Sequence, residues 1–157
     1  MLPLWAQVTL AVVPALSAVF AAFGLLLNVA QSRRTNTQSR AALVATCIKD
    51  FADDEAMQRV FYLIEYSEFR YDSSFHKSPL ERETDKLLQH FANLALAWQA
   101  GLLSIEDVRS VQYYVVCIMR NPEIQKYLKF VADWTVEADL GRHPYVALNE
   151  MYEELAK

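Results

Sequence analysis

The first 32 residues contain no charged side chain, and positions 4–27 are almost entirely apolar. An α-helix rises about 1.5 Å per residue, so about 20 residues cross the hydrocarbon core of a bilayer. The pattern therefore predicts a transmembrane helix within residues 1–32. A cleaved signal peptide is the alternative, but it would need a basic segment followed by a shorter apolar core. Neither feature is present, so we expect an anchor.

The charges beside this segment predict its orientation. Arg33, Arg34 and Arg40 follow the apolar run, and no positive side chain precedes it. The positive-inside rule then places the N-terminus outside and residues 33–157 in the cytoplasm, at an inner (plasma) membrane. Residues 33–40 form a basic juxtamembrane neck, either a helical extension of the anchor or a short flexible linker. Alanines at helical spacing allow close approach of anchors in lipid, although alanine is common in any membrane helix: Ala11, Ala15, Ala18 and Ala22.

From residue 41 onward, apolar side chains recur every three or four positions, which is the spacing of helices with one buried face. Such stripes cover residues 41–51, 57–64, 80–98, 108–118, 124–134 and 145–155. The stripes include Phe91, Trp98 and Trp134, and no acidic residue is expected on them. They predict an all-α fold, in which one transmembrane helix carries a cytoplasmic bundle of about five or six helices over residues 41–157.

Residues with known capping preferences stand between the stripes. Ser78 followed by Pro79 is typical of a helix start, and Gly101 is typical of a helix end. The acidic cluster Asp53, Asp54 and Glu55 suits the N-terminus of a helix, where the dipole favours negative charge. Weaker boundary signals are Ser104 with Asp107, Asn121 with Pro122, and Gly141. The valine-rich stretch 108–118 also resembles a strand, but its caps and its spacing of three to four favour a helix.

Composition excludes several classes of protein. The chain has 157 residues with 15 Lys+Arg against 19 Asp+Glu, a formal net charge of -4, so overall basic charge cannot bind duplex nucleic acid. Three glycines leave no glycine-rich phosphate loop. A hydrophobic share of 54% with 22% charged residues excludes a disordered chain.

Catalytic and metal-binding motifs are missing from the sequence. Cys47 and Cys117 are too far apart for a zinc or redox motif, and a cytoplasmic location predicts that both are reduced. His76, His90 and His143 show no metal-ligand spacing, and His90 is expected at the boundary of the core beside Phe91. We therefore expect no metal, no cofactor and no enzyme activity.

One segment departs from the bundle pattern, between Glu65 and Lys77. Its aromatic residues interleave with Arg70, His76 and Lys77, a mixture that can stack on a base and neutralise a phosphate. A packed loop between helices has the same composition, with Phe69, Tyr71 and Phe75 filling a gap while Arg70 pairs with Asp72 or Glu68. Both interpretations stay open. The candidate ligand contacts are Arg70, Tyr71, His76 and Lys77, with Arg142 and His143 as a weaker second group near the last helix.

Two resemblances bear on function. Leu87–Ala95 followed by Gly101–Asp107 resembles a helical domain of unknown function in small bacterial membrane-anchored proteins, where a Leu-Leu-x-x-Phe helix precedes a Gly-Leu-hydrophobic turn with an acidic pair. That resemblance covers residues 55–132 and implies no catalytic residue. By size and layout alone, the chain is also similar to a membrane effector of type III CRISPR antiviral defence. Such an effector binds cyclic tetra-adenylate through a cytoplasmic helical domain and assembles as an oligomer.

The sequence thus predicts a ligand-sensing membrane effector. We expect its cytoplasmic domain to form a symmetric homo-oligomer and to bind an anionic second messenger, a cyclic oligonucleotide, so that the membrane is perturbed. A net-acidic domain can hold several phosphates where basic side chains from more than one subunit converge. The alternative is a membrane-tethered scaffold that recruits a partner protein without a small-molecule ligand.

Overall fold

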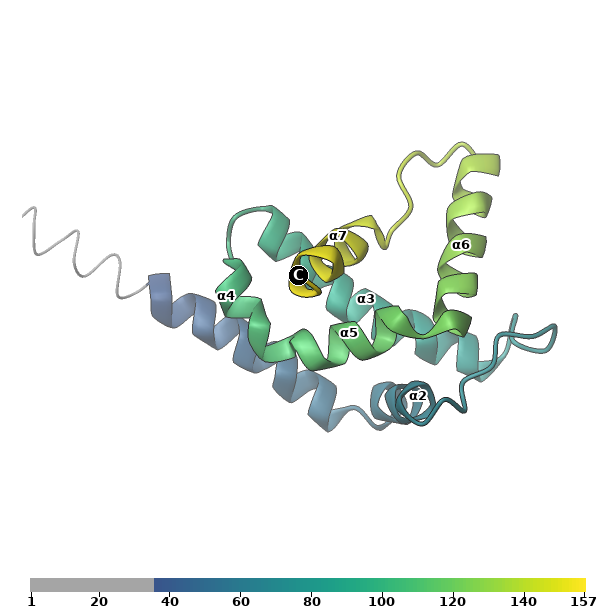
Figure 1. Ribbon diagram of the computed structural model, residues 1–157, viewed down its shortest axis with the longest axis horizontal. Coiled ribbons are helices and arrows are strands. Elements are labelled where there is room, and N and C mark those ends of the chain that lie inside the picture. The colour runs from purple at the N-terminus through teal and green to yellow at the C-terminus, as the bar shows by residue number, and fades with distance from the viewer. Residues whose placement is uncertain (1–35) are drawn as a thin grey trace, which may run out of the picture. The chain divides into compact units, whose positions relative to one another are not determined.

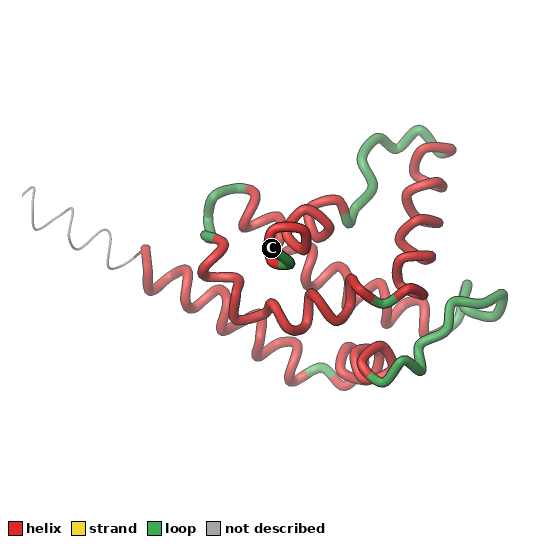
Figure 2. Tube along the Cα trace, in the orientation of Figure 1, coloured by secondary structure: helices red, strands yellow, loops and turns green. Residues whose placement is uncertain are grey.

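The computed structural model describes residues 36–157, and all regular structure in that range is helical (Figures 1 and 2). The all-α prediction is therefore confirmed for this part of the chain. The predicted membrane anchor, residues 1–32, and residues 33–35 of the predicted neck lie outside the described residues. Within residues 36–157, no helix has both the length and the apolar character that a membrane span requires.

Residues 40–157 form one compact unit, called here the helical domain. A first helical segment is described over residues 36–53. The helices that follow are α2 (Glu55–Glu65), α3 (Pro79–Gln99), α4 (Ile105–Val108), the 3₁₀ helix η1 (Arg109–Val111), α5 (Gln112–Arg120), α6 (Pro122–Glu137) and α7 (Val146–Leu155).

Local side-chain hydrogen bonds begin most of these helices, as predicted. Ser78 accepts from the Glu81 amide ahead of α3, and Asn121 accepts from the second and third amides of α6. Ser104 and Asp107 form a reciprocal capping box at α4. Gly101 has φ +73° just beyond α3, a left-handed conformation that only glycine adopts without strain.

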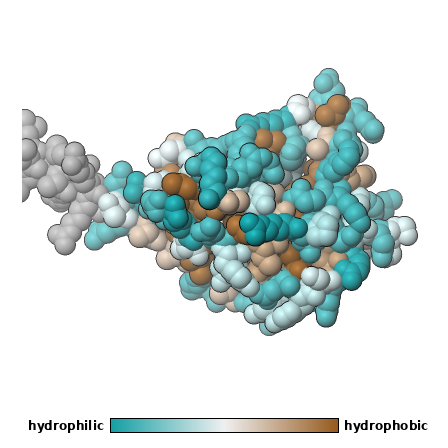
Figure 3. All heavy atoms as spheres, in the orientation of Figure 1, coloured by the Kyte–Doolittle hydropathy of each residue, from teal (hydrophilic) through white to brown (hydrophobic). Residues whose placement is uncertain are grey.

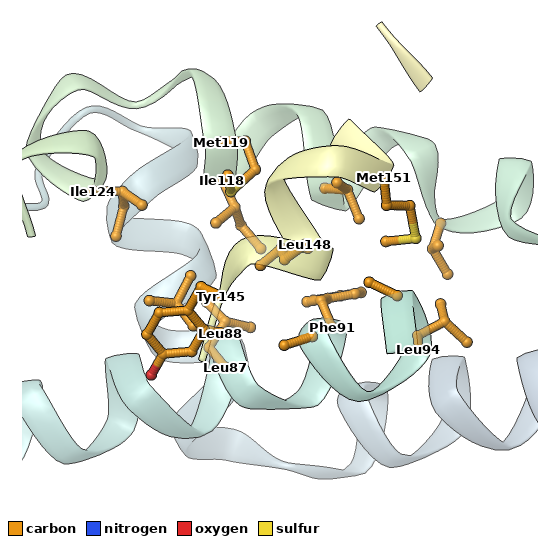
Figure 4. Close-up of a cluster of buried hydrophobic side chains, with 14 of the residues drawn as sticks. Leu87, Leu88, Phe91, Leu94, Ile118, Met119, Ile124, Tyr145, Leu148 and Met151 are labelled. Atoms are coloured by element: carbon orange, nitrogen blue, oxygen red, sulfur yellow. The ribbon is translucent and has the colours of Figure 1, made fainter. Parts of the chain in front are cut away.

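The core lies between α3 and its neighbours. α3 packs against α2 and α7, and α5 packs against α2, α6 and α7. Figure 4 shows Leu87, Leu88 and Phe91 of α3 facing Leu148 and Met151 of α7, and all five side chains are buried. Full burial of such a side chain stabilises the fold by about 1.5–3 kcal/mol. The α3 stripe is therefore the main apolar seam of the domain.

The predicted helix over 108–118 is correct in type but interrupted. η1 separates α4 from α5, and Val108, Val111, Val115 and Ile118 are all buried across the break. In a 3₁₀ turn, residues three positions apart lie directly above one another, so the turn keeps Val108 and Val111 on the same face.

The prediction that Trp98 and Trp134 lie in the core is wrong. Trp98 is only partly buried, and Trp134 is 53% exposed. α6 also ends at Glu137, ahead of the predicted stop at Gly141, and Asp139 (φ +53°) and Gly141 (φ +79°) turn the chain beyond it. Trp134 is exposed because α6 packs against α5 and then runs away from it (Figure 1). Only the face with Ile124, Tyr127, Leu128 and Thr135 is buried.

Candidate ligand-binding cleft

The two candidate segments of the sequence meet at one cleft of about 500 Å³. His76 and Lys77 line it from the loop before α3, and Pro144 and Tyr145 line it from the loop before α7. The other lining residues come from α3 and α6: Glu81, Asp85, Tyr127, Phe130, Val131 and Trp134. This space is called the aromatic cleft below. Its volume lies in the range of small-molecule sites, about 300–1,000 Å³.

Part of the Glu65–Lys77 segment is a packed loop, and part of it lines the cleft. Phe69 and Phe75 are buried and fill the space under the loop. Arg70 does not form the expected pair with Asp72 or Glu68, since its guanidinium donates to the carbonyl oxygens of Ser67 and Phe69 at 2.7 and 2.8 Å. Arg70 therefore holds the loop, while His76 and Lys77 face the cleft.

A chain of hydrogen bonds orients the imidazole in the cleft. The Tyr71 hydroxyl lies 2.9 Å from His76 Nε2, and His76 Nδ1 lies 2.9 Å from Glu81 Oε1. The second Glu81 oxygen accepts from the Lys77 amide at 2.5 Å. With Nδ1 donating to the carboxylate, Nε2 of a neutral imidazole accepts from Tyr71. Lys77 has φ +64°, and this left-handed turn aims its amide at Glu81.

These contacts keep Glu81 ionised. Burial acts to raise the pKa of Glu81, but the hydrogen bonds from His76 and the Lys77 amide outweigh it and hold that pKa below its usual value. The pKa of Tyr71 is raised, first by burial and then by the negative charge of Glu81, so its hydroxyl keeps the proton.

Asp85 is a partly buried acidic residue that flanks the apolar stripe of α3. Its Oδ1 accepts from the hydroxyls of Tyr127 at 2.6 Å and Tyr145 at 3.0 Å, which come from α6 and from the start of α7. The two hydrogen bonds offset the cost of placing a carboxylate between helices. Burial and then the hydrogen bond to Asp85 raise the pKa of Tyr127, and burial and then the charge of Asp85 raise that of Tyr145.

Exposed aromatic rings form the outer wall. Phe130 is 42% and Trp134 53% exposed, and the Phe130 ring centroid lies 4.5 Å from that of His76. Tyr127 stacks on Phe130 with an interplanar angle of 17°. Ring faces that are open at one side and supported at the other suit stacking of a planar group.

The charges in the cleft are mixed. Among the described residues that line it, Lys77 is the one lysine or arginine, and Glu81 and Asp85 supply two carboxylates. Lys77 can therefore pair with one anionic group, and the two carboxylates offer acceptors to a ligand with N–H donors.

The weaker candidates, Arg142 and His143, lie beside the cleft and do not line it. Arg142 pairs with Glu150, and His143 Nδ1 accepts from the Tyr145 amide at 3.2 Å. Burial and then the charge of Arg142 lower the pKa of His143, so this residue is neutral at pH 7. Both side chains shape the loop that carries Pro144 and Tyr145.

Cys47 and His90 are in contact, which is the arrangement of a nucleophile and its general base. Cys47 Sγ lies 3.2 Å from His90 Nε2, but the same nitrogen lies 3.0 Å from the Cys47 carbonyl oxygen. Burial and then Asp50 raise the pKa of Cys47 to about 11, so the thiolate is not formed at neutral pH. Within residues 36–157, no group of three or more His, Cys, Asp or Glu side chains could hold a metal ion.

Sequence reasoning missed the six lining residues that lie in helices: Glu81, Asp85, Tyr127, Phe130, Val131 and Trp134. Tyr127, Phe130 and Trp134 recur at helical spacing, and this aromatic row was the available signal.

Protein-family models, curated proteins and solved structures provide no significant match to this chain. The fold and the site define an all-helical domain with a ligand-sized aromatic cleft. Function is therefore inferred from the chemistry of that cleft.

Proposed function

We propose that the helical domain is the sensing part of a membrane-anchored effector and binds a nucleotide in the aromatic cleft. The convergence of distant segments on one cleft supports this proposal. Two segments that are distant in the sequence meet where open aromatic rings, Lys77 and two carboxylates line the same space. Clefts with a few polar groups in an apolar lining are typical of small-molecule sites.

Each part of a nucleotide has a counterpart in the cleft. A base stacks on the open faces of Phe130 and Trp134, as bases do on aromatic side chains. One phosphate pairs with Lys77. The carboxylates of Asp85 and Glu81 accept from an exocyclic amino group, which adenine offers and uracil lacks.

A cyclic oligonucleotide carries more phosphates than one cleft can balance. Several copies of Lys77 around a symmetry axis would supply the additional charge. The proposal therefore keeps the predicted symmetric homo-oligomer, with cyclic tetra-adenylate as a candidate ligand and bilayer perturbation at the inner membrane as the response in antiviral defence.

Fluorescence of Trp134 provides the direct test. The chain has three tryptophans, so a Trp5→Phe/Trp98→Phe variant leaves Trp134 as the sole reporter. The full chain in mild detergent is titrated with AMP, ATP, cyclic di-AMP and cyclic tetra-adenylate. We expect a saturable change with an adenine nucleotide. A ligand at 100 times its Kd should also stabilise the protein by about 2.7 kcal/mol in thermal unfolding.

A matched pair of variants separates binding in the cleft from general electrostatics. Lys77→Gln removes the charge in the cleft, and Lys49→Gln removes an exposed lysine on residues 36–53 that pairs with Asp53. We expect Lys77→Gln to weaken nucleotide binding about tenfold or more, since a charge-assisted contact contributes about 1.5–3 kcal/mol. Lys49→Gln should bind like the wild type. Equal effects would show that the phosphate binds elsewhere.

A membrane-tethered scaffold is the second candidate, and a different surface supports it. Tyr62 of α2 and Tyr66, the residue after the last one of α2, are exposed, and their rings stack at a centroid distance of 6.1 Å. Exposed tyrosine pairs are typical of protein interfaces. If no nucleotide changes Trp134 fluorescence or thermal stability, the sensing proposal fails and the scaffold takes its place.

A further inference from the structure

α6 carries a second surface on the side away from its buried residues. A shallow groove of about 370 Å³ runs along it, lined by Lys126, Lys129, Phe130, Asp133, Trp134 and Glu137. These residues are called the outer face of α6. Figure 3 shows, in one view of the domain, apolar side chains reaching the surface among hydrophilic ones. Phe130 and Trp134 of the outer face are both exposed.

Glu123 in the first turn of α6 suits the helix dipole and pairs with Lys126 at 2.6 Å, but the charges of the outer face itself run in the opposite order. Lys126 and Lys129 lie in its N-terminal half, whereas Asp133 and Glu137 lie towards its C-terminal end. The helix dipole favours the opposite arrangement. Lys129 and Asp133 do form an i,i+4 pair at 2.8 Å, but with the lysine first, which is the less favourable order. Their side chains are 74% and 61% exposed, so this pair contributes little stability.

This arrangement is complementary to itself when the helix direction is reversed. An axis level with residues 131 and 132 places Lys126 opposite the partner's Glu137, and Lys129 opposite the partner's Asp133. Phe130 then faces the partner's Trp134. Each of these pairs matches in height to within about one residue, or about 1.5 Å.

We propose that the outer face of α6 binds the same face of a second copy of this chain, with the two helices antiparallel about a two-fold axis. Residue i then contacts residue j of the partner, and j contacts i, as an isologous interface requires. The antiparallel partner also places the negative end of its dipole beside Lys126 and the positive end beside Glu137, which favours both charges.

A second copy fits this face better than the other classes of partner do. Nucleic acid and an anionic membrane would be repelled by Asp133 and Glu137, and α6 has no larger apolar stripe on that face to enter a bilayer. α6 has 16 residues, so we expect a weak, reversible dimer that a high local concentration favours.

The inference deepens the proposed function, because an oligomeric sensor needs a self-association surface. Phe130 and Trp134 line both the outer face and the aromatic cleft, so pairing would cover the outer edge of the cleft. The biological role of the pairing rests on the proposed function, whereas the contact itself does not. The test below uses no nucleotide, so failure of one proposal leaves the other standing.

Zero-length cross-linking tests the contact directly. Full chains labelled with ¹⁴N and ¹⁵N are mixed in equal amounts, treated with a carbodiimide and digested. We expect mixed-isotope links from Lys126 to Glu137 and from Lys129 to Asp133, whereas links within one copy carry a single isotope. If α6 forms no mixed-isotope links, or links only to other helices of the second copy, the inference is wrong.

Charge exchange tests whether this complementarity drives the contact. Lys126→Glu/Lys129→Glu makes the face wholly acidic, and Asp133→Lys/Glu137→Lys makes it wholly basic, so neither variant should pair with itself. A 1:1 mixture of the two, and the fourfold variant that combines all four changes, should regain α6-to-α6 links. Lys49→Glu/Asp53→Lys reverses an exposed pair outside α6 and should leave the wild-type links unchanged.

A further variant tests the apolar contribution. Trp134→Glu keeps the four charged residues but places a carboxylate at the centre of the contact, and it should lower the yield of mixed-isotope links at least fivefold. Unchanged links in Trp134→Glu, or no recovery in the fourfold variant, would contradict antiparallel pairing.

Discussion

α3 and α6 carry apolar stripes of similar spacing, yet the two helices pack in different surroundings. α3 packs against α2 and α7, and its stripe from Leu87 to Ala95 is buried. α6 packs against α5 and leaves Phe130 and Trp134 exposed beside the aromatic cleft. A helical stripe therefore predicts a face, whereas neighbouring helices decide whether that face becomes core or binding surface.

The largest expected effect is a contrast between these two helices. Phe91→Ala removes a fully buried ring from α3 and should destabilise the protein by about 3–5 kcal/mol. Trp134→Ala removes a larger but exposed ring from α6 and should cost about 1 kcal/mol or less. Urea unfolding of the full chain, followed by circular dichroism, measures both. Similar losses would show that Trp134 is covered in solution by core packing.

The next largest loss of stability is expected at Asp85, which links α3 to α6 through Tyr127. Asp85→Ala leaves the hydroxyls of Tyr127 and Tyr145 without their shared acceptor, which should cost about 1–3 kcal/mol. The loss should shrink in a Tyr127→Phe/Tyr145→Phe background, since no donor then remains unpaired. A double-mutant cycle from unfolding curves measures this coupling. Additive losses would mean that Asp85 acts through other contacts.

A smaller effect is expected at the start of α3, where the core helix meets the cleft. Ser78→Ala removes the hydroxyl that accepts from the Glu81 amide and should cost about 1 kcal/mol. Fraying of this turn would also displace Glu81 from His76. Amide hydrogen exchange should therefore rise over residues 80–82 with no change at Phe91. Faster exchange along the whole of α3 would argue against a local role.

The smallest effect is a pH dependence that belongs to the cleft. The folded state holds the pKa of Glu81 below its ordinary value of 4.5, so Glu81 stabilises the fold at and above that pH and loses this contribution as pH falls through the lower, folded value. The stability difference between the wild type and Glu81→Gln should therefore shrink as pH is lowered from 6 towards 3. Thermal unfolding across that interval measures it. A difference that grows on acidification has the wrong sign for this role.

Local chemistry explains which features the sequence determined by itself. Helix starts at Ser78, Ser104 and Asn121 depend on hydrogen bonds that span two or three residues, so their residue types suffice to predict them. The stripe of α3 also follows from spacing, because an apolar face of about five turns has to be buried. The predicted membrane anchor is of the same local kind, although it lies outside the described residues.

Contacts between distant residues explain what only the tertiary structure decided. Asp85 lies 42 positions from Tyr127 and 60 from Tyr145, and no local pattern marks a carboxylate that two tyrosines will share. The exposure of Trp134 likewise depends on where α6 leaves α5. Spacing along the chain therefore predicted the helices and part of the site, while the cleft exists only because packing brings α3, α6 and two loops together.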